Sequence, residues 1–318
     1  MQIKEIHIAD ENTVPTRLQE YGVGVFQKIA TKSALKKAIK KQHLFVNGSI
    51  ATTAIVIVSG DIIEYYHPAI SGAKTRLKLN LEIVYEDDYL AVINKPAGIL
   101  VSGNGFKTVA NALVQNLKES LAKDAVNPQP AHRLDYATTG LLLVGKTNSV
   151  ITDLNRLFEH KNISKTYYAI TIGAMNTTGT IDLDIDGKPA ISTFEVVETV
   201  KSERFTFLNL VRLNPQTGRR HQLRKHLLGI GNPILGDATY FLEGLQLKGK
   251  GLYLHAQSIE FNHPVTNENM HVVLELPKKF KKLFPKKDKW LVQRKRRSER
   301  IHYGAKQLTN LKTIFNFF

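Results

Sequence analysis

Short apolar runs separated by polar turns dominate the middle of the chain. Residues 81–85 and 90–93 are two such runs on either side of Asp87 and Asp88, a pattern that predicts a β-hairpin. Residues 205–213 alternate with both faces partly apolar, which also indicates a strand. Further strands are predicted at residues 141–144, 166–172 and 193–197.

Two other segments of this region have helical spacing. Ile151, Leu154, Leu157 and Phe158 fall on one helical face, and Asn148 stands where an N-cap is expected. Residues 222–228 read as a second helix, which Gly229 and Gly231 would end. Because strands outnumber helices, we predict an α+β domain built on a mainly antiparallel sheet.

The N-terminal region has a short amphipathic helix with a cationic face. Residues 33–41 place Leu35, Ala38 and Ile39 on one side, and no acidic residue lies near the surrounding lysines in the sequence. A strand over residues 44–46 then enters a tight Asn47-Gly48 turn, and Gly60-Asp61 marks a second turn. A cationic helix backed by a hairpin suits contact with a phosphate backbone.

Charge divides the chain into regions and indicates the class of partner. The 318 residues hold 44 Lys and Arg against 28 Asp and Glu, a net charge of +16. Residues 278–300 alone contain twelve Lys or Arg and two acids. We expect a polyanionic partner, with nucleic acid ahead of an acidic membrane surface. We predict an N-terminal module (1–70), a linker (71–80), a main domain (81–283) and a basic extension (284–318).

Several classes of protein do not fit the composition and motifs. The chain has no cysteine, so disulfides, thiolate metal sites and the zinc deaminases are excluded. Neither a Gly-x-Ser-x-Gly elbow nor a His-Glu-x-x-His motif occurs, which argues against a hydrolase. The sequence shows no signal-peptide pattern and no apolar run near the roughly 20 residues that cross a bilayer. We therefore expect a cytoplasmic monomer with no membrane contact, cofactor or metal.

A polar loop ahead of a predicted buried strand is the candidate site. Residues 132–140 read His-Arg-Leu-Asp-Tyr-Ala-Thr-Thr-Gly and lead directly into the strand at residues 141–144. An acid beside an arginine is by itself more often a surface turn than a site. The place of this one at a strand end favours a function, because functional groups commonly lie on such loops.

Five separated blocks of the chain form an ordered set: residues 92–98, 132–140, 165–169, 218–237 and 254–266. Together they resemble the catalytic domain of the RluA family of pseudouridine synthases, and the resemblance spans residues 81–283. Two positions depart from the family: Thr139 stands where Ser is usual, and Arg220 stands where Thr or Ser is common. Residues 17–65 similarly resemble the S4 RNA-binding domain, with Lys32 where that family usually carries Arg.

The resemblance implies an isomerase that converts uridine in structured RNA to pseudouridine after base flipping. It assigns the catalytic carboxylate to Asp135, and it assigns to Arg224 the role of a cation that keeps the buried carboxylate charged through two hydrogen bonds. Tyr167 would stack on the flipped uracil, and Arg133 would stabilise the flipped state. Further candidates for substrate binding are His132, Thr138, Lys32, Lys36, Lys37 and Lys40.

Some alternatives remain open at this stage. His132 is equally consistent with a structural hydrogen bond. The S4 resemblance favours large-subunit ribosomal RNA, with transfer RNA as the alternative. An RNA-binding protein with the same fold but no catalysis would also keep the cationic helix and the basic extension. The same extension is expected to add RNA affinity that is independent of sequence, through phosphate contacts.

Overall fold

The computed structural model describes residues 4–26, 29, 31–66 and 77–284. The chain forms two compact units, residues 1–75 and 76–318, and each is considered by itself. Most of the predicted linker and nearly all of the predicted basic extension lie outside the described residues. No helix within the described part of the chain is long and apolar enough to cross a membrane.

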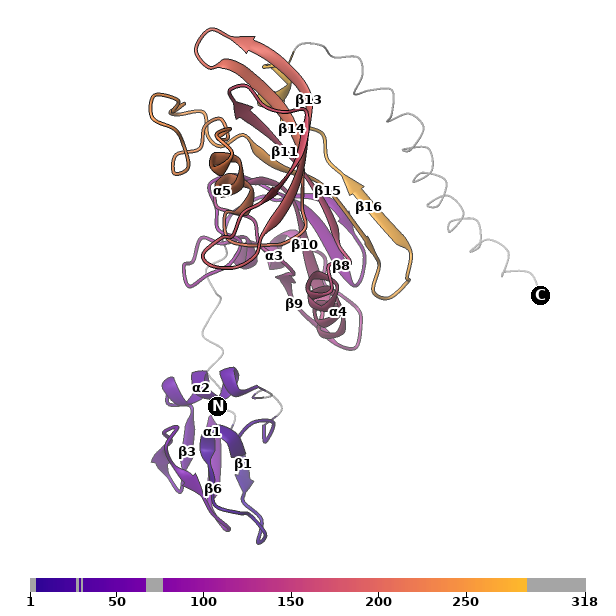
Figure 1. Ribbon diagram of the computed structural model, residues 1–318. Helices are drawn as coiled ribbons and strands as arrows, with labels where there is room; N and C mark the ends of the chain where they lie inside the picture. Colours follow the sequence, from indigo (N-terminus) through magenta and orange to yellow (C-terminus); the bar gives the residue numbers. More distant parts are fainter. Residues whose placement is uncertain (1–3, 27–28, 30, 67–76, 285–318) are drawn as a thin grey trace, which may run out of the picture. The chain divides into compact units, whose positions relative to one another are not determined.

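The N-terminal unit is a small sheet with two helices (Figure 1). The predicted helix starts one residue early, at Lys32, because the Thr31 hydroxyl accepts a hydrogen bond from the Ala34 amide. The turn at Asn47 and Gly48 has positive φ at both residues, as a tight hairpin requires. The elements are β1 (Lys4–Ile8), β2 (Thr16–Arg17), α1 (Leu18–Tyr21), α2 (Lys32–Lys40), β3 (Leu44–Val46), β4 (Ser49–Ile50), β5 (Val56–Ile57) and β6 (Ile62–Tyr66), with sheet order β1-β6-β3-β4 and β2 paired to β5.

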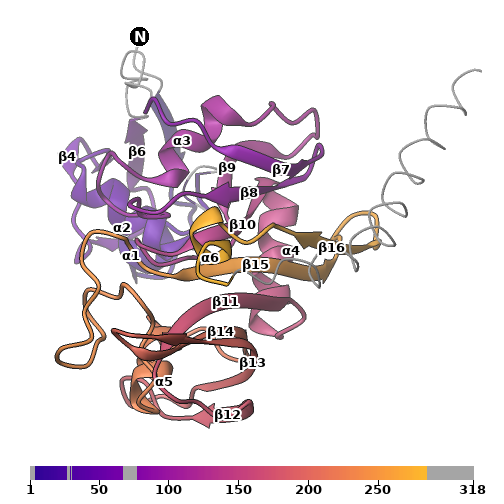
Figure 2. The same cartoon turned by 90° about the horizontal axis from the view of Figure 1, so that it is seen from above.

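The C-terminal unit is built on one large sheet, in which only β10 and β15 pair in parallel (Figures 1 and 2). The prediction of a mainly antiparallel α+β domain is therefore confirmed. The strand order along the sheet is β12-β13-β14-β11-β15-β10-β8-β7. In addition, β16 pairs with β15, and β9 pairs with β10. The elements are β7 (Glu82–Glu86), β8 (Leu90–Lys95), α3 (Val109–Asn116), β9 (Ala125–Pro130), β10 (Thr139–Thr147), α4 (Asn148–Glu159), β11 (Ser164–Ile172), β12 (Thr178–Asp182), β13 (Ile191–Ser202), β14 (Thr206–Pro215), α5 (Gln222–Gly229), β15 (Leu254–Asn262), β16 (Asn269–Val273) and α6 (Lys278–Lys281).

Helices cover both faces of the central strands. Successive residues of β8 and β10 enter two different apolar clusters, one shared with α3 and one with α4. Leu142 packs in the α3 cluster, whereas Leu141 and Leu143 pack in the α4 cluster.

The predicted N-cap of helix α4 was wrong by one residue. Thr147, and not Asn148, accepts the capping hydrogen bond from the Val150 amide.

The start of β10 allows a close approach that fixes the candidate loop. Gly140 has φ +115°, and a Cβ there would lie 2.2 Å from the carbonyl oxygen of Ala256 on β15. Only glycine fits this conformation and this space. The parallel pairing of β10 with β15 therefore begins directly after the loop that carries Asp135, and it anchors the end of that loop.

Candidate active site

Asp135 lies in the loop between β9 and β10 and lines a cleft of about 820 Å³. Its neighbour Leu134 is buried in the apolar cluster under α3, and the Thr138 amide donates to the Asp135 carbonyl. The carboxylate itself is 15% exposed. The loop thus presents a nearly buried carboxylate to the cleft on a backbone that is tied down at both ends.

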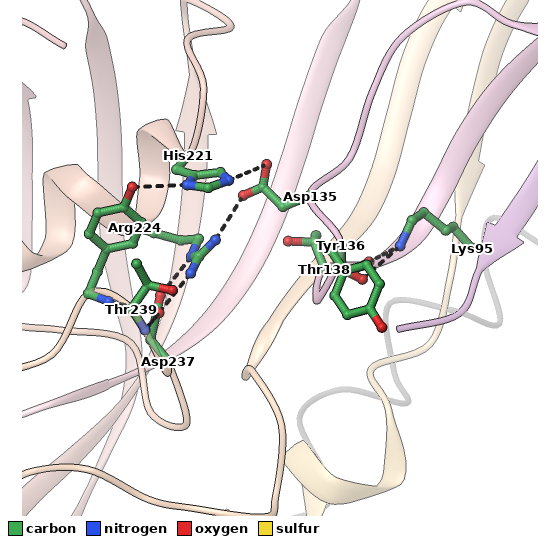
Figure 3. Close-up of polar contacts among 9 residues, drawn as sticks. Lys95, Asp135, Tyr136, Thr138, His221, Arg224, Asp237 and Thr239 are labelled. Carbon is green, nitrogen blue, oxygen red and sulfur yellow. Dashed lines mark hydrogen bonds and ion pairs between the residues drawn. The ribbon is translucent and has the colours of Figure 1, made fainter. Parts of the chain in front are cut away.

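Lys95 holds this loop from inside the protein. It is fully buried, and its ammonium group donates to the carbonyls of Pro96 (2.9 Å), Tyr136 (3.3 Å) and Thr138 (2.9 Å). Burial lowers its pKa to about 8, although the negative charge of Asp135 opposes the shift. Figure 3 shows Lys95 reaching the carbonyls of the residues that follow Asp135. Sequence analysis did not select this residue, although it lies in the first matched block.

Replacing Lys95 by Met is expected to loosen the loop. The variant removes the Lys95 donor from three carbonyls, of which that of Tyr136 keeps a second donor in the Gly98 amide. A buried acceptor left unpaired costs about 1–3 kcal/mol. We expect the free energy of unfolding to fall by about that amount in a denaturant titration. We also expect kcat for RNA modification to fall, because the Asp135 backbone loses its support.

Lys146 offers a matched control for Lys95. It is also buried, but its ammonium group bonds to Glu86 (2.9 Å) and to the Asp87 carbonyl (2.6 Å), away from the cleft. Lys146→Met is expected to reduce stability and leave kcat unchanged. If both variants changed kcat equally, Lys95 would have no specific effect on the loop.

Arg224 of α5 faces Asp135, but its two best hydrogen bonds go to another carboxylate. Its Nε and Nη2 donate to the two oxygens of Asp237 at 2.7 and 2.8 Å. Its Nη1 lies 3.6 Å from Oδ2 of Asp135 (Figure 3). The expected proximity of residues 135 and 224 is present. The expectation that two hydrogen bonds would join this pair was wrong, because Asp237 occupies that side of the guanidinium.

Asp237 is a buried anchor that sequence analysis did not identify as a site residue. Its side chain is fully buried, and it also accepts hydrogen bonds from the amides of Thr239 and Tyr240. Burial would raise its pKa, but the bonds from Arg224 and from those amides outweigh burial and lower the pKa. The charge of Asp237 is thus fully satisfied, and it fixes the guanidinium next to Asp135.

His221 is a second group that faces Asp135. Its Nε2 lies 3.8 Å from Oδ1 of Asp135, and its Nδ1 lies 2.9 Å from the Tyr240 hydroxyl. His221 precedes α5 with φ +56°, a left-handed conformation that non-glycine residues adopt mostly at turns and functional sites. Sequence analysis did not select His221, although it lies in the fourth matched block. Within the described residues, no group of three or more His, Asp or Glu is placed to hold a metal ion.

Tyr167 of β11 lines the same cleft, and its ring packs against two apolar clusters. Burial raises its pKa, and the charge of Asp135 adds to the shift. The phenol therefore stays protonated at neutral pH, and its hydroxyl is available as a donor. Tyr168, the next residue of β11, is buried and does not line the cleft, in line with the alternation of side chains along a strand.

The other predicted residues of the cleft are Arg133, His132 and Thr138, and they differ in exposure and in contacts. Arg133 is exposed at the cleft. His132 accepts a hydrogen bond from the Leu143 amide at 3.0 Å and packs on Phe158, an arrangement that fits its structural alternative. Burial, together with the charge of Lys165, lowers its pKa to about 3 and keeps it neutral. Thr138 is buried in the cleft wall.

The predicted lysines of the N-terminal unit are all exposed on α2, while Leu35, Ala38 and Ile39 are buried beneath them. No acid lies near these lysines in the sequence, but in the structure the ammonium group of Lys32 lies 3.7 Å from the carboxylate of Glu20. Both side chains of this pair are half exposed, so the interaction is weak. The remaining predicted lysines of this face are Lys36, Lys37 and Lys40.

Cations surround the cleft around Asp135. Two acids, Asp135 and Glu159, are among its lining residues, and five cations face them. A cleft with such an excess of positive charge attracts a polyanion. The five cationic residues are Arg133, Lys161, Lys165, Arg219 and Arg220.

Comparison with known proteins identifies the family. A family model described as RNA pseudouridylate synthase matches residues 89–228. The chain is 31% identical over 299 residues to ribosomal large subunit pseudouridine synthase D of Pseudomonas aeruginosa, a match covering 83% of this chain and 89% of that protein. The chain belongs to the RluA family of RNA pseudouridine synthases. It is accordingly an isomerase that acts on RNA.

Further relatives of this RluA-family enzyme are also pseudouridine synthases. The chain is 34% identical over 226 residues to dual-specificity RNA pseudouridine synthase RluA of Haemophilus influenzae, and the match covers 66% of this chain and 95% of that protein. The solved structure of human RNA pseudouridylate synthase domain containing 4 superposes with a TM-score of 0.50 at 27% identity, covering 63% of this chain and 90% of that one.

Proposed function

We propose that this RluA-family enzyme uses Asp135 to convert uridines of large-subunit ribosomal RNA to pseudouridine. The observation that carries the proposal is the position of this carboxylate. It lies in a cationic cleft, with Arg224 facing one oxygen and His221 facing the other. The positive charge of Arg224 stabilises this carboxylate, which is only 15% exposed.

The reaction breaks the bond between uracil N1 and ribose C1′ and forms a bond between C5 and C1′. The C5 proton leaves, N1 gains a proton, and no electrons are lost or gained overall. Asp135 would act by covalent attack or by abstracting a proton from the sugar. Both routes need a charged carboxylate held in a fixed direction, which the contacts to Arg224 and His221 favour.

Tyr167 and Arg133 are proposed to hold the flipped nucleotide. A protonated phenol is a poor base, so we assign the Tyr167 ring to stacking on the uracil and its hydroxyl to hydrogen bonding. Arg133 is exposed at the cleft and is free to enter the space that the flipped base leaves in the RNA. Unstacking the base costs about a few kcal/mol, which such contacts offset.

The choice of ribosomal RNA rests on the relatives that match most of the chain. The large-subunit synthases of Pseudomonas aeruginosa and Rickettsia prowazekii both match over 83% of the chain. Residues 76–318 make up a smaller share of the chain than this, so each match must include part of the N-terminal unit. The dual-specificity relative matches over 66%. A shared N-terminal unit therefore favours the large-subunit substrate.

The N-terminal unit is proposed to act as an S4-like RNA-binding domain through the exposed lysines of α2. The basic extension beyond residue 284 is proposed to add phosphate contacts that are independent of sequence. It lies outside the described residues, so its support is its charge alone. The monomeric state and the cytoplasmic location stay predictions.

Mapping pseudouridine in cells with and without this gene tests the substrate. We expect one or more positions of large-subunit ribosomal RNA to carry uridine in the deletion strain and to regain pseudouridine on complementation. Loss of pseudouridine from transfer RNA alone would move the proposal to that substrate. If no position changed, the non-catalytic alternative would be favoured.

A further inference from the structure

One loop, residues 237–240, contacts both groups that face Asp135. Asp237 accepts two hydrogen bonds from Arg224, and the Tyr240 hydroxyl lies 2.9 Å from Nδ1 of His221. The Tyr240 ring also lies next to the Arg224 guanidinium, with 4.8 Å between its centroid and Cζ. The loop therefore contacts both neighbours of the proposed catalytic carboxylate rather than Asp135 itself.

The contacts of His221 decide which of its nitrogens carries the proton. A neutral imidazole has one N–H donor and one acceptor nitrogen. With the proton on Nδ1, the lone pair of Nε2 would face the carboxylate of Asp135 and repel it. With the proton on Nε2, the N–H faces Asp135 and Nδ1 accepts from the Tyr240 hydroxyl. Only the second arrangement makes both contacts favourable.

The surroundings of His221 favour the neutral ring. Burial lowers its pKa, and Asp135, which raises it, is opposed by three cations. The three cations are Arg220, Arg224 and Lys225. The carboxylate of Asp186 also interacts electrostatically with His221. A neutral ring has two tautomers, so a neighbour that selects one of them has a direct effect on Asp135.

We propose that Tyr240 is a positioning residue that selects the Nε2–H tautomer of His221, so that this N–H is directed at Asp135. The inference rests on the proposed role of Asp135. The separation of 3.8 Å is longer than a hydrogen bond, and such contacts commonly shorten when substrate binds. The N–H of His221 then orients one carboxylate oxygen while Arg224 faces the other. Tyr240 acts only through His221.

Nuclear magnetic resonance of the full chain with ¹⁵N-labelled histidine tests the tautomer directly. The signal of His221 is assigned by its loss in His221→Gln. We expect Nε2 to carry the proton in the wild-type enzyme near neutral pH, and both tautomers to be populated in Tyr240→Phe. A wild-type His221 protonated on Nδ1, or a fully charged ring, would overturn the proposal without any variant.

Kinetics of Tyr240→Phe give the functional readout. The substitution removes one oxygen and keeps the ring beside Arg224. We expect kcat to fall on the order of 10-fold, in line with other residues that orient a catalytic group, while KM for RNA stays within about twofold. In His221→Gln the further change Tyr240→Phe should have little additional effect, because the hydroxyl acts through the imidazole.

Tyr85→Phe is the matched control. The Tyr85 hydroxyl donates to Asp87 at 2.8 Å, and His263 contacts the same carboxylate at 2.9 Å, outside the cleft lining. This variant also removes a hydroxyl from a Tyr-Asp-His cluster, and we expect kcat to be unchanged. An equal loss of kcat in both variants, or an unaltered tautomer in Tyr240→Phe, would contradict the inference. If Asp135→Asn kept full turnover, the proposed function itself would fail, whatever Tyr240→Phe did.

Discussion

Asp135→Asn is expected to abolish pseudouridine formation while leaving RNA binding nearly intact. The amide has the shape of the carboxylate but carries no charge, so it can neither attack nor take a proton effectively. Removing the reacting group of an enzyme typically lowers kcat by roughly 10⁴-fold or more. We expect the RNA contacts to come from the cations that line the cleft, which the substitution leaves in place. One fewer negative charge among them should not weaken phosphate binding.

Single-turnover conversion and an RNA-binding titration at fixed salt measure the two effects separately. Asp153→Asn serves as the control, because this exposed carboxylate of α4 pairs only with Arg156, one turn along the same helix. We expect the control to keep full turnover and full affinity. Turnover near the wild-type rate in Asp135→Asn would refute the catalytic assignment. A large loss of affinity would mean that the variant is disturbed beyond its carboxylate.

The strands and helices with regular apolar spacing could be predicted from the sequence. The runs at residues 81–85 and 90–93 form β7 and β8, and residues 222–228 lie within α5. Helix α3 was not predicted: it is eight residues long, as α5 is, but no glycine follows it to mark its end, and its C-cap is Leu117. Strand β15 was treated only as part of a motif. Apart from the neighbouring β16, its pairing partners are 85 or more residues away, and no local pattern indicates them.

The candidate site could be predicted only in part, because its residues also come from segments that are far apart in the sequence. The proximity of Asp135 and Arg224 was implied by resemblance, since no spacing rule joins residues on different elements. Which carboxylate would take the two strong bonds of the guanidinium depends on how residues 236 and 237 approach α5. Gly236 has φ +75°, and a Cβ there would lie 2.1 Å from the Gly251 carbonyl oxygen. That packing, rather than any motif, sets the direction of Asp237.

Asp237→Asn is expected to have the largest effect on stability and to reduce activity as well. Asp237 is fully buried and balances the buried charge of Arg224 with two short bonds. An asparagine places an NH₂ group against one N–H donor of the guanidinium and leaves a buried cation without its main partner. Breaking such a pair from one side costs about 3–5 kcal/mol. Differential scanning calorimetry of the wild type and the variant measures the loss.

Asp186→Asn is the control, because its partner Lys225 lies on α5 next to Arg224. It removes the carboxylate that pairs with Lys225 of α5, but this carboxylate is 68% exposed, whereas that of Asp237 is fully buried. We expect a much smaller loss of stability from it, because water screens an exposed pair. Equal losses in Asp237→Asn and Asp186→Asn would mean that burial does not strengthen the Arg224–Asp237 pair.

The double variant Arg224→Gln with Asp237→Asn separates stability from activity. Once both charges are gone, no buried cation is left unpaired, so we expect the double variant to be more stable than the sum of the two single losses predicts. Turnover should stay low, because Asp135 then lacks the cation that faces its Oδ2. A double variant that recovered turnover together with stability would show that Arg224 serves the fold alone. Persistent low turnover in a well-folded double variant would place its role at the carboxylate of Asp135.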